Sequence, residues 1–227
     1  MEKTTHLDTS VFTFLKTLEK NNNRDWFAKN KHRYVAANQH FKALAEDINV
    51  GMQEQDNIEK MKLFRIYRDV RFSKNKDPYK NNFSGSFSRA TEALRGGYYF
   101  HLQPGNNSFM AGGFWQPEAG DLKRIREEIA AYADPLRKII NSKSFKEHFG
   151  ELGGQQLKSN PRGYAKDHPN IDLLRYKSFV VSKNFTDQEV QTPGFANEIL
   201  KYFKATRPFF NYMSDVLTTD SNGVSLI

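Results

Sequence analysis

The sequence predicts an α+β fold: an antiparallel sheet of about five strands packed with helices from the N-terminal, central and C-terminal segments. Residues 83–115 alternate apolar and polar side chains, which is typical of an antiparallel sheet with one covered face. The segments on either side repeat apolar residues every three or four positions, the period of an amphipathic helix. No linker or internal repeat interrupts these patterns. We therefore expect one domain over residues 1–227, with a core at about 10–217 and a flexible tail at 218–227.

Two helices are expected before the sheet. Residues 8–10 (DTS) are good N-cap residues, and the asparagines at 21–23 compete for backbone hydrogen bonds and should end the first helix. Asn23 can cap a second helix, which carries an apolar stripe from Trp26 to Ile48. Gly51 is the expected end of this second helix.

Five strands are expected after these helices. They are 62–72, 83–89, 97–103, 107–115 and a buried strand at 178–182. The turn residues 104–106 (PGN) join two of them into a hairpin. The pair Gly112-Gly113 indicates a bulge or a close backbone approach, for which packing is the commoner reason.

Helices are expected again in the central and C-terminal segments. Proline or capping residues mark their starts near 117, 186 and 193, and Ser144 begins a further short helix. Pro135 ends or kinks the helix that starts near 117. Residues 155–176 are rich in loop-forming residues. These helices complete the covering of the sheet.

The most unusual stretch of the chain is residues 62–82, in which basic side chains interrupt a strand pattern. Its apolar side consists of Phe64, Ile66, Val70 and Phe72. Arg68 falls on that same side, where an unpaired charge costs several kcal/mol. We therefore expect Arg68 to be buried in a structural ion pair with a carboxylate. The other face should carry the exposed, ligand-facing positive charges.

Charge is concentrated in and just after this stretch. Residues 62–95 contain nine basic and three acidic side chains, so they carry +6 of the chain's net +8. Arginine and lysine bind phosphates and carboxylates, which makes an anionic ligand the natural partner. The candidate ligand-binding residues are Arg65, Arg71, Lys74, Lys76, Tyr79 and Lys80. The alternative is a solvated basic face without a ligand.

Several segments together resemble the DUF2461 family, a group of conserved hypothetical bacterial proteins. The similar segments are 14–16 (FLK), 22–27 (NNRDWF), 64–74 (FRIYRDVRFSK), 78–80 (PYK), 97–99 (GYY), 112–118 (GGFWQPE), 122–129 (LKRIREEI) and 177–182 (KSFVVS). They span roughly residues 10–215 in order. The family pattern more often has Asp at position 75 and Thr at position 77, where this chain has Asn75 and Asp77. The resemblance implies a fold and a whole-chain domain, and it implies no activity.

Composition and motifs exclude several chemistries. The absence of cysteine excludes disulfides, thiolate catalysis and cysteine metal sites. The six histidines lack paired metal-ligand spacing, and neither a Walker loop nor a GxGxxG motif occurs. We therefore expect no metal and no cofactor. The polar N-terminus and the lack of a long apolar run predict a cytoplasmic protein without a membrane partner.

Two classes of function remain open. The first is a binding module for an anionic partner, either nucleic acid or a phosphorylated small molecule, through the 62–82 stretch. The second is an enzyme that acts on a small anionic substrate, with the basic cluster as an electrostatic clamp and Asp69 or His101 as acid or base. A flat basic face would favour nucleic acid. A concave pocket with convergent Arg, Tyr and His would favour a small ligand.

Overall fold

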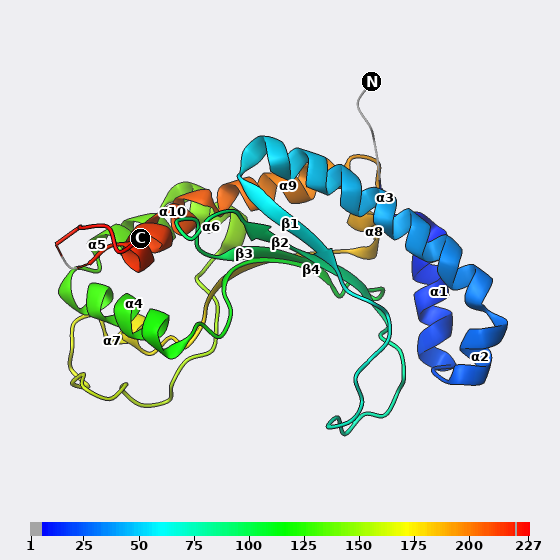
Figure 1. Cartoon of the computed structure of the whole chain (residues 1–227), viewed down its shortest axis with the longest axis horizontal. Helices are drawn as coiled ribbons and strands as arrows, with labels where there is room; N and C mark the ends of the chain where they lie inside the picture. The colour runs from blue at the N-terminus through cyan, green and yellow to red at the C-terminus, as the bar shows by residue number, and fades with distance from the viewer. Residues whose placement is uncertain (1–5, 221) are drawn as a thin grey trace. The chain divides into compact units, whose positions relative to one another are not determined.

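The computed structural model describes residues 6–220 and 222–227, within which the chain forms ten helices and five strands (Figure 1). The helices are α1 (Thr9–Lys20), α2 (Arg24–Lys29), α3 (Lys31–Gln55), α4 (Ala119–Ala131), α5 (Asp134–Ile140), α6 (Lys143–Phe149), α7 (Ile171–Leu174), α8 (Asp187–Val190), α9 (Phe195–Ala205) and α10 (Arg207–Thr218). The strands are β1 (Ile58–Leu63), β2 (Phe83–Arg89), β3 (Gly97–Leu102), β4 (Ser108–Phe114) and β5 (Phe179–Phe185).

The predicted α+β class and the five-stranded antiparallel sheet are confirmed. The strands are hydrogen-bonded in sequence order, β1-β2-β3-β4-β5. Along β3 and β4, buried and half-buried residues alternate, as the sequence pattern predicted. None of the described helices is long and apolar enough to cross a membrane.

The chain divides into two compact units. The first consists of the described residues up to Phe87 together with Tyr99–Met110 and Asn184–Lys201. The second consists of Ser88–Tyr98, Ala111–Lys183 and the described residues of Tyr202–Ile227. Strands β2 to β5 each contribute residues to both units.

In the first unit, the segment after Asn23, which was predicted to form one helix, forms two helices, α2 and α3. Asn23 caps α2 by accepting a hydrogen bond from the Trp26 N–H, and the chain breaks at Asn30 before α3 begins. Phe41 of α3 stacks on Phe83 of β2, with the ring centroids 4.9 Å apart. Figure 1 shows α1 and α2 beside the N-terminal part of α3. Most of the apolar stripe that the sequence predicted is buried, and its first residue, Trp26, is half-buried.

Gly51 does not end α3, which continues to Gln55. A Cβ atom at this position would lie 2.2 Å from the Leu200 Cδ1 of α9. The glycine therefore serves the close approach of a neighbouring side chain, not the termination of the helix.

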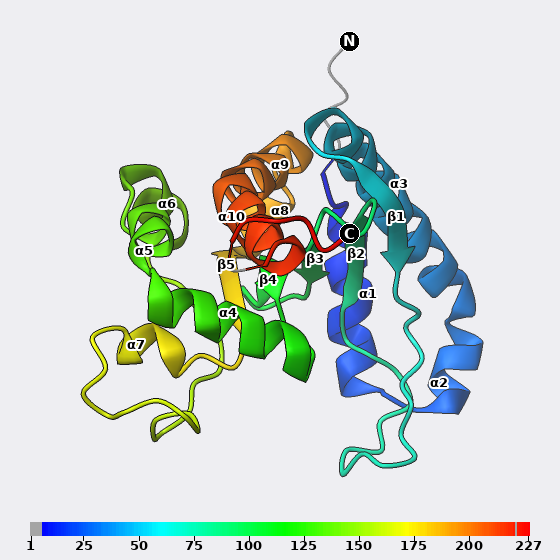
Figure 2. The ribbon, with the colours of Figure 1, turned by 60° about the vertical axis from the view of Figure 1, so that its left-hand side comes forward.

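In the second unit, aromatic side chains fill the space between strands and helices. Tyr98 of β3 makes edge-on contacts with Phe203 and Phe210, at centroid distances of 5.1 and 4.8 Å. Helix α10 packs against α4 and α5, and α4 packs against α7 (Figure 2). Gly113 has a φ of 146°, and a Cβ there would lie 2.2 Å from the Phe179 carbonyl oxygen. The expectation that packing explains the glycine pair is confirmed.

The expected strand at 62–72 is wrong, because β1 ends at Leu63. Phe64 makes a last ladder hydrogen bond to the Ser84 carbonyl, at 2.9 Å, and the chain then leaves the sheet. Of the four apolar residues assigned to the core, only Ile66 is buried, and Phe72 is 97% exposed. The alternating apolar and polar residues after Leu63 therefore belong to a loop and not to a strand of the sheet.

The last residues fold back on the end of α10. Leu226 N–H donates to the Thr218 carbonyl at 2.8 Å, and Asp220 N–H donates to the Val224 carbonyl at 2.9 Å. Thr219 and Ser225 form an isolated antiparallel bridge in this segment. The flexible tail at 218–227 stays a prediction.

Candidate functional site

The candidate site is built on the connection between β1 and β2, residues 64–82, in the first unit. The base of this loop is a short antiparallel pairing, in which Tyr67 bridges to Tyr79. Arg68 N–H donates to the Pro78 carbonyl at 2.9 Å, and Lys80 N–H donates to the Ile66 carbonyl at 2.7 Å. Loops of this length without helix or strand are uncommon, and they are usually either functional or linker segments.

A side chain from the segment between α1 and α2 anchors this loop base. The Asn22 amide donates to the Tyr79 carbonyl at 2.9 Å and accepts from the Tyr79 N–H at 3.1 Å. These are the two backbone hydrogen bonds that a residue of a neighbouring strand would otherwise make. The Tyr79 ring stacks on Phe27 at a centroid distance of 3.9 Å and a 12° interplanar angle. Burial, with Tyr67 close by, raises the pKa of the Tyr79 hydroxyl. Asn22 therefore fixes the backbone of Tyr79, and Phe27 fixes its ring.

The loop base and the sheet enclose a cavity of about 670 Å³. Its volume is within the range that small-molecule sites occupy. Its charged and aromatic lining includes Arg68, Lys80, Tyr79, Tyr99, His101 and Phe64. The sequence placed Lys80, Tyr79 and His101 in one functional region, and the structure brings them together.

Arg68 and Lys80 are the two cations of this cavity. In the Tyr67–Tyr79 pairing, Arg68 lies opposite Pro78 and Lys80 lies opposite Ile66, so the two cations are diagonal neighbours, and both line the cavity. Burial, together with the nearby Arg65 and Arg68 guanidinium groups, lowers the pKa of the Lys80 ammonium. The Lys80 Nζ also lies 5.5 Å from the Phe64 ring centroid. These positive charges stand near one another, and a bound anion would relieve their repulsion.

The predicted ion pair of Arg68 is not formed among the described residues. Its guanidinium is half-buried and contacts the Ser73 Oγ at 3.5 Å, and it lines the cavity. The prediction assumed that the apolar side of a strand continued to Phe72. Because the chain has left the sheet, the side that Arg68 faces is a polar cavity.

Four of the expected ligand-binding residues lie outside the cavity lining. Arg65, Arg71, Lys74 and Lys76 are all exposed. Arg71 forms an ion pair with Asp69 at 2.6 Å, and Lys76 Nζ donates to the Val70 carbonyl at 3.0 Å. The assignment of the two faces is thus reversed for the arginines: Arg68 faces the cavity, and Arg65 and Arg71 do not line it.

Of the two acid-base candidates, His101 lines the cavity and Asp69 does not. The hydrogen bonds from Arg71 hold the pKa of the exposed Asp69 carboxyl below its usual range. This carboxylate is engaged as the counter-ion of Arg71.

His101 belongs to a row of polar side chains on one face of β3. Its Nε2 lies 2.8 Å from the Gln103 Oε1, and its Nδ1 lies 3.1 Å from the Tyr99 hydroxyl. An amide oxygen can only accept, so Nε2 carries the proton and Nδ1 accepts from Tyr99. Burial lowers the pKa of the His101 imidazole, and the nearby Lys80 lowers it further, while the bond to Gln103 opposes them. The neutral imidazole is the favoured form.

The sequence assigned no binding role to the other polar residues of the cavity. These are Glu19, Asn22, Asn75, Asp77, Asn81, Asn82 and Ser84. Asn22 belongs to a run of three asparagines that was interpreted only as a helix stop. A usable signal existed for Tyr99, because it is two positions from His101 and therefore shares its face of the strand.

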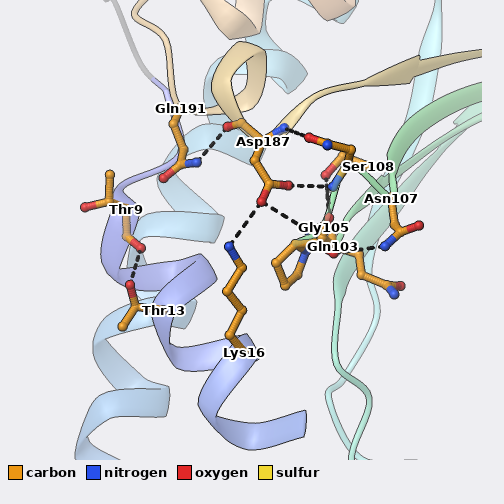
Figure 3. Close-up of polar contacts among 11 residues, drawn as sticks. Thr9, Thr13, Lys16, Gln103, Gly105, Asn107, Ser108, Asp187 and Gln191 are labelled. Atoms are coloured by element: carbon orange, nitrogen blue, oxygen red, sulfur yellow. Dashed lines mark hydrogen bonds and ion pairs between the residues drawn. The ribbon is translucent and has the colours of Figure 1, made fainter.

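The β3–β4 turn that follows Gln103 is fixed by a separate polar cluster, shown in Figure 3. Asp187, at the start of α8, accepts from the Asn106 N–H at 2.9 Å, the Gly105 N–H at 3.0 Å and the Lys16 Nζ at 3.2 Å. Gln103 N–H donates to the Ser108 Oγ at 3.0 Å. This cluster holds the end of β3, where Gln103 orients His101.

The described residues contain no group of three or more histidine, aspartate or glutamate side chains placed to hold a metal ion. The cavity instead offers guanidinium, ammonium, amide, hydroxyl and carboxylate groups, which bind organic ligands through hydrogen bonds. Its geometry suits recognition of a polar small molecule.

Comparison with protein families identifies the family of this chain. The sequence model of the DUF2461 family, described as conserved hypothetical protein, matches residues 10–212. No curated protein and no solved structure matches the chain. The matched range covers the segments that carried the resemblance and the whole cavity. The chain therefore belongs to the DUF2461 family.

Proposed function

We propose that the protein binds a small anionic ligand, such as a phosphorylated metabolite, in the cavity between the 64–82 loop and the sheet. One observation supports this above all. Arg68 and Lys80 line a concave site together with His101 and two tyrosines, and neither cation forms an ion pair with a described carboxylate. Guanidinium and ammonium groups in a recessed, partly dehydrated site attract phosphate more strongly than exposed ones do.

Nucleic acid fits this arrangement less well than a small ligand. The exposed positive side chains Arg65, Lys74 and Lys76 lie outside the cavity, and Arg71 is neutralised by Asp69. A duplex binds to a surface and not inside a cavity of about 670 Å³. The concave site therefore favours the phosphorylated small molecule of the two anionic partners.

The test is a calorimetric titration with inorganic phosphate at low ionic strength. We expect saturable binding that weakens about tenfold or more in Lys80→Ala, because a charge-assisted hydrogen bond contributes about 1.5–3 kcal/mol. The matched control is Lys74→Ala, which removes an exposed lysine outside the cavity and should leave the affinity unchanged.

Equal losses in both variants would place the anion on the loop surface. A fluorescent duplex titrated in parallel, from low to physiological salt, tests the nucleic-acid alternative. Duplex binding with a steep salt dependence, and no phosphate binding, would replace the proposed function.

A second candidate, an enzyme acting on a small anionic substrate, is favoured by the Tyr99–His101–Gln103 row. The neutral His101 accepts from the Tyr99 hydroxyl, which gives the cavity an oriented hydroxyl and a base. Phosphorus NMR of a bound phosphorylated compound, followed over hours, tests this candidate. Turnover that is lost in His101→Gln supports it, and an unchanged spectrum leaves a binding role.

A further inference from the structure

The cavity contains hydrogen-bond acceptors as well as cations. Glu19 and Asp77 bring two carboxylates to its lining, and Asn81 and Asn82 bring amides. Glu19 accepts from the Asn81 Nδ2 at 2.8 Å, and neither carboxylate forms an ion pair with a described residue. The lining therefore has two positive and two negative side chains. A ligand that carried negative charge alone would satisfy only half of it.

The size of the cavity also indicates a ligand that is larger than an anionic group alone. A volume of about 670 Å³ is in the middle of the range for sites that hold whole small molecules, and a phosphate ion fills only a small part of it. The part of the ligand beyond its anionic group must therefore meet the carboxylates and amides. Because an ionised carboxylate only accepts hydrogen bonds, that part needs donors.

We propose that the ligand is a sugar or polyol that carries a single phosphate group, an inference that rests on the proposed function. Arg68 and Lys80 bind the phosphate. Glu19 and Asp77 accept hydrogen bonds from the hydroxyl groups, and the Asn82 amide both donates to them and accepts from them. The aromatic rings of the lining give the carbon skeleton an apolar surface.

The carboxylates also select against other anions. A second or third phosphate would approach Glu19 or Asp77, which are exposed residues of the lining, and like charges repel. Nucleoside diphosphates and triphosphates are therefore disfavoured. An amine would satisfy a carboxylate as well as a hydroxyl does, so a phosphorylated amine is the alternative that the test must separate.

The test compares affinities by calorimetry for inorganic phosphate, glucose 6-phosphate, ribose 5-phosphate, glycerol 3-phosphate, unphosphorylated glucose and phosphoethanolamine. We expect at least one polyol phosphate to bind ten times more tightly than inorganic phosphate, and glucose to bind more weakly than its phosphate. The ratio of polyol phosphate to phosphate affinity is the diagnostic quantity, because removing a carboxylate also strengthens the binding of any anion.

Two variants test whether the carboxylates cause the higher affinity for a polyol phosphate than for phosphate. The double substitution Glu19→Ala and Asp77→Ala should bring the ratio close to one while phosphate still binds. Glu59→Ala removes an exposed carboxylate of β1 outside the cavity lining and should leave the ratio unchanged.

Each remaining outcome contradicts the inference in a distinguishable way. If phosphate binds and none of the three polyol phosphates binds more tightly, the ligand class is wrong and the anion site remains. Tighter binding of phosphoethanolamine than of every polyol phosphate would assign the carboxylates to an amine. If neither phosphate nor any phosphorylated probe binds, the proposed function falls together with the ligand class.

Discussion

At the scale of single residues, the surroundings of His101 set its protonation. The ring stacks on Phe109 at 4.8 Å and 19°, and its two nitrogens are occupied by Tyr99 and Gln103. Burial disfavours the charged imidazolium, and Lys80 adds a repulsive positive charge. His101 therefore reports directly on the electrostatics of the cavity.

We predict a pKa for His101 below the ordinary value of about 6.5. Lys80→Met should raise this pKa, because it removes the second of the two causes, whereas Lys74→Met should leave it unchanged. An NMR titration of the His101 Cε1–H resonance measures all three proteins. A pKa at or above 6.5, or one that does not respond to Lys80→Met, would contradict the described surroundings of the ring.

The lowered pKa of His101 makes the free energy of unfolding depend on pH. The unfolded histidine binds a proton near pH 6.5, while the folded one resists it, so the unfolded chain binds more protons below that pH. The contribution of His101 to the free energy of unfolding should therefore fall as the pH decreases through about 6.5.

At the scale of elements, the loop base depends on an asparagine from another segment. The Asn22 amide makes two hydrogen bonds to the Tyr79 backbone and thereby fixes the positions of the neighbouring Pro78 and Lys80. A part-buried hydrogen bond contributes about 0.5–1.5 kcal/mol. The geometry of the cavity is thus coupled to the segment between α1 and α2.

Asn22→Ala is expected to lower the free energy of unfolding by about 2 kcal/mol and to weaken phosphate binding. Asn57→Ala, which changes an exposed side chain without a hydrogen bond to the described residues, serves as the control. Urea unfolding and calorimetry measure the two effects. An Asn22→Ala protein with unchanged stability and affinity would show that the loop base is held without this clamp.

A pair of glycines in the second unit tests the packing of β4. Gly113→Ala should destabilise the protein by about 3 kcal/mol or more, because the new Cβ would overlap the Phe179 carbonyl in a strained backbone conformation. Gly120→Ala, in the first turn of α4, meets nothing within 4 Å and should be neutral or stabilising by up to about 1 kcal/mol. Thermal unfolding of both variants checks this, and equal effects would contradict the described packing.

The Asp187 cluster predicts how the first unit responds to acid. Burial opposes ionisation of this carboxyl, but the Asn106 and Gly105 N–H groups and Lys16 outweigh it and lower its pKa. A carboxyl with a lowered folded pKa stabilises the fold above its unfolded value, about 3.9, and loses that contribution as the pH falls through the folded value. Asp187→Asn should therefore be about 1–2 kcal/mol less stable at pH 7 and less sensitive between pH 5 and 2. Chemical unfolding at several pH values measures this, and parallel pH profiles would contradict it.

At the scale of the whole molecule, periodicity predicted the fold class, the hairpin and most helix starts. The alternation at 97–103 and the capping pair Thr186 and Glu189 are local signals, and the structure contains both features. The role of Gly51 was misjudged and the contact of Asn22 with Tyr79 was missed, because they depend on residues distant in sequence, Leu200 and Tyr79. The asparagines at 21–23 do follow the end of α1, as predicted. Local patterns cannot report such partners.

The candidate site was predicted as a region but not in its geometry. The basic stretch and His101 were expected to belong to one functional region, and Lys80, Tyr79 and His101 line the same cavity. The direction of Arg68 was wrong, because alternation was continued beyond Leu63, where β1 ends. The residue at which β1 leaves the sheet depends on its pairing with β2, which is distant in sequence.

Arg68 lines the cavity in which we propose that the ligand binds, and Arg71 does not line it. Calorimetric titration of inorganic phosphate into Arg68→Ala and Arg71→Ala, with the unfolding temperature of each variant recorded, tests this proposal most directly. We predict that Arg68→Ala unfolds within a few degrees of the unmodified protein and binds phosphate at least tenfold more weakly, while Arg71→Ala keeps its affinity. Retained binding in Arg68→Ala with lost binding in Arg71→Ala would contradict the account.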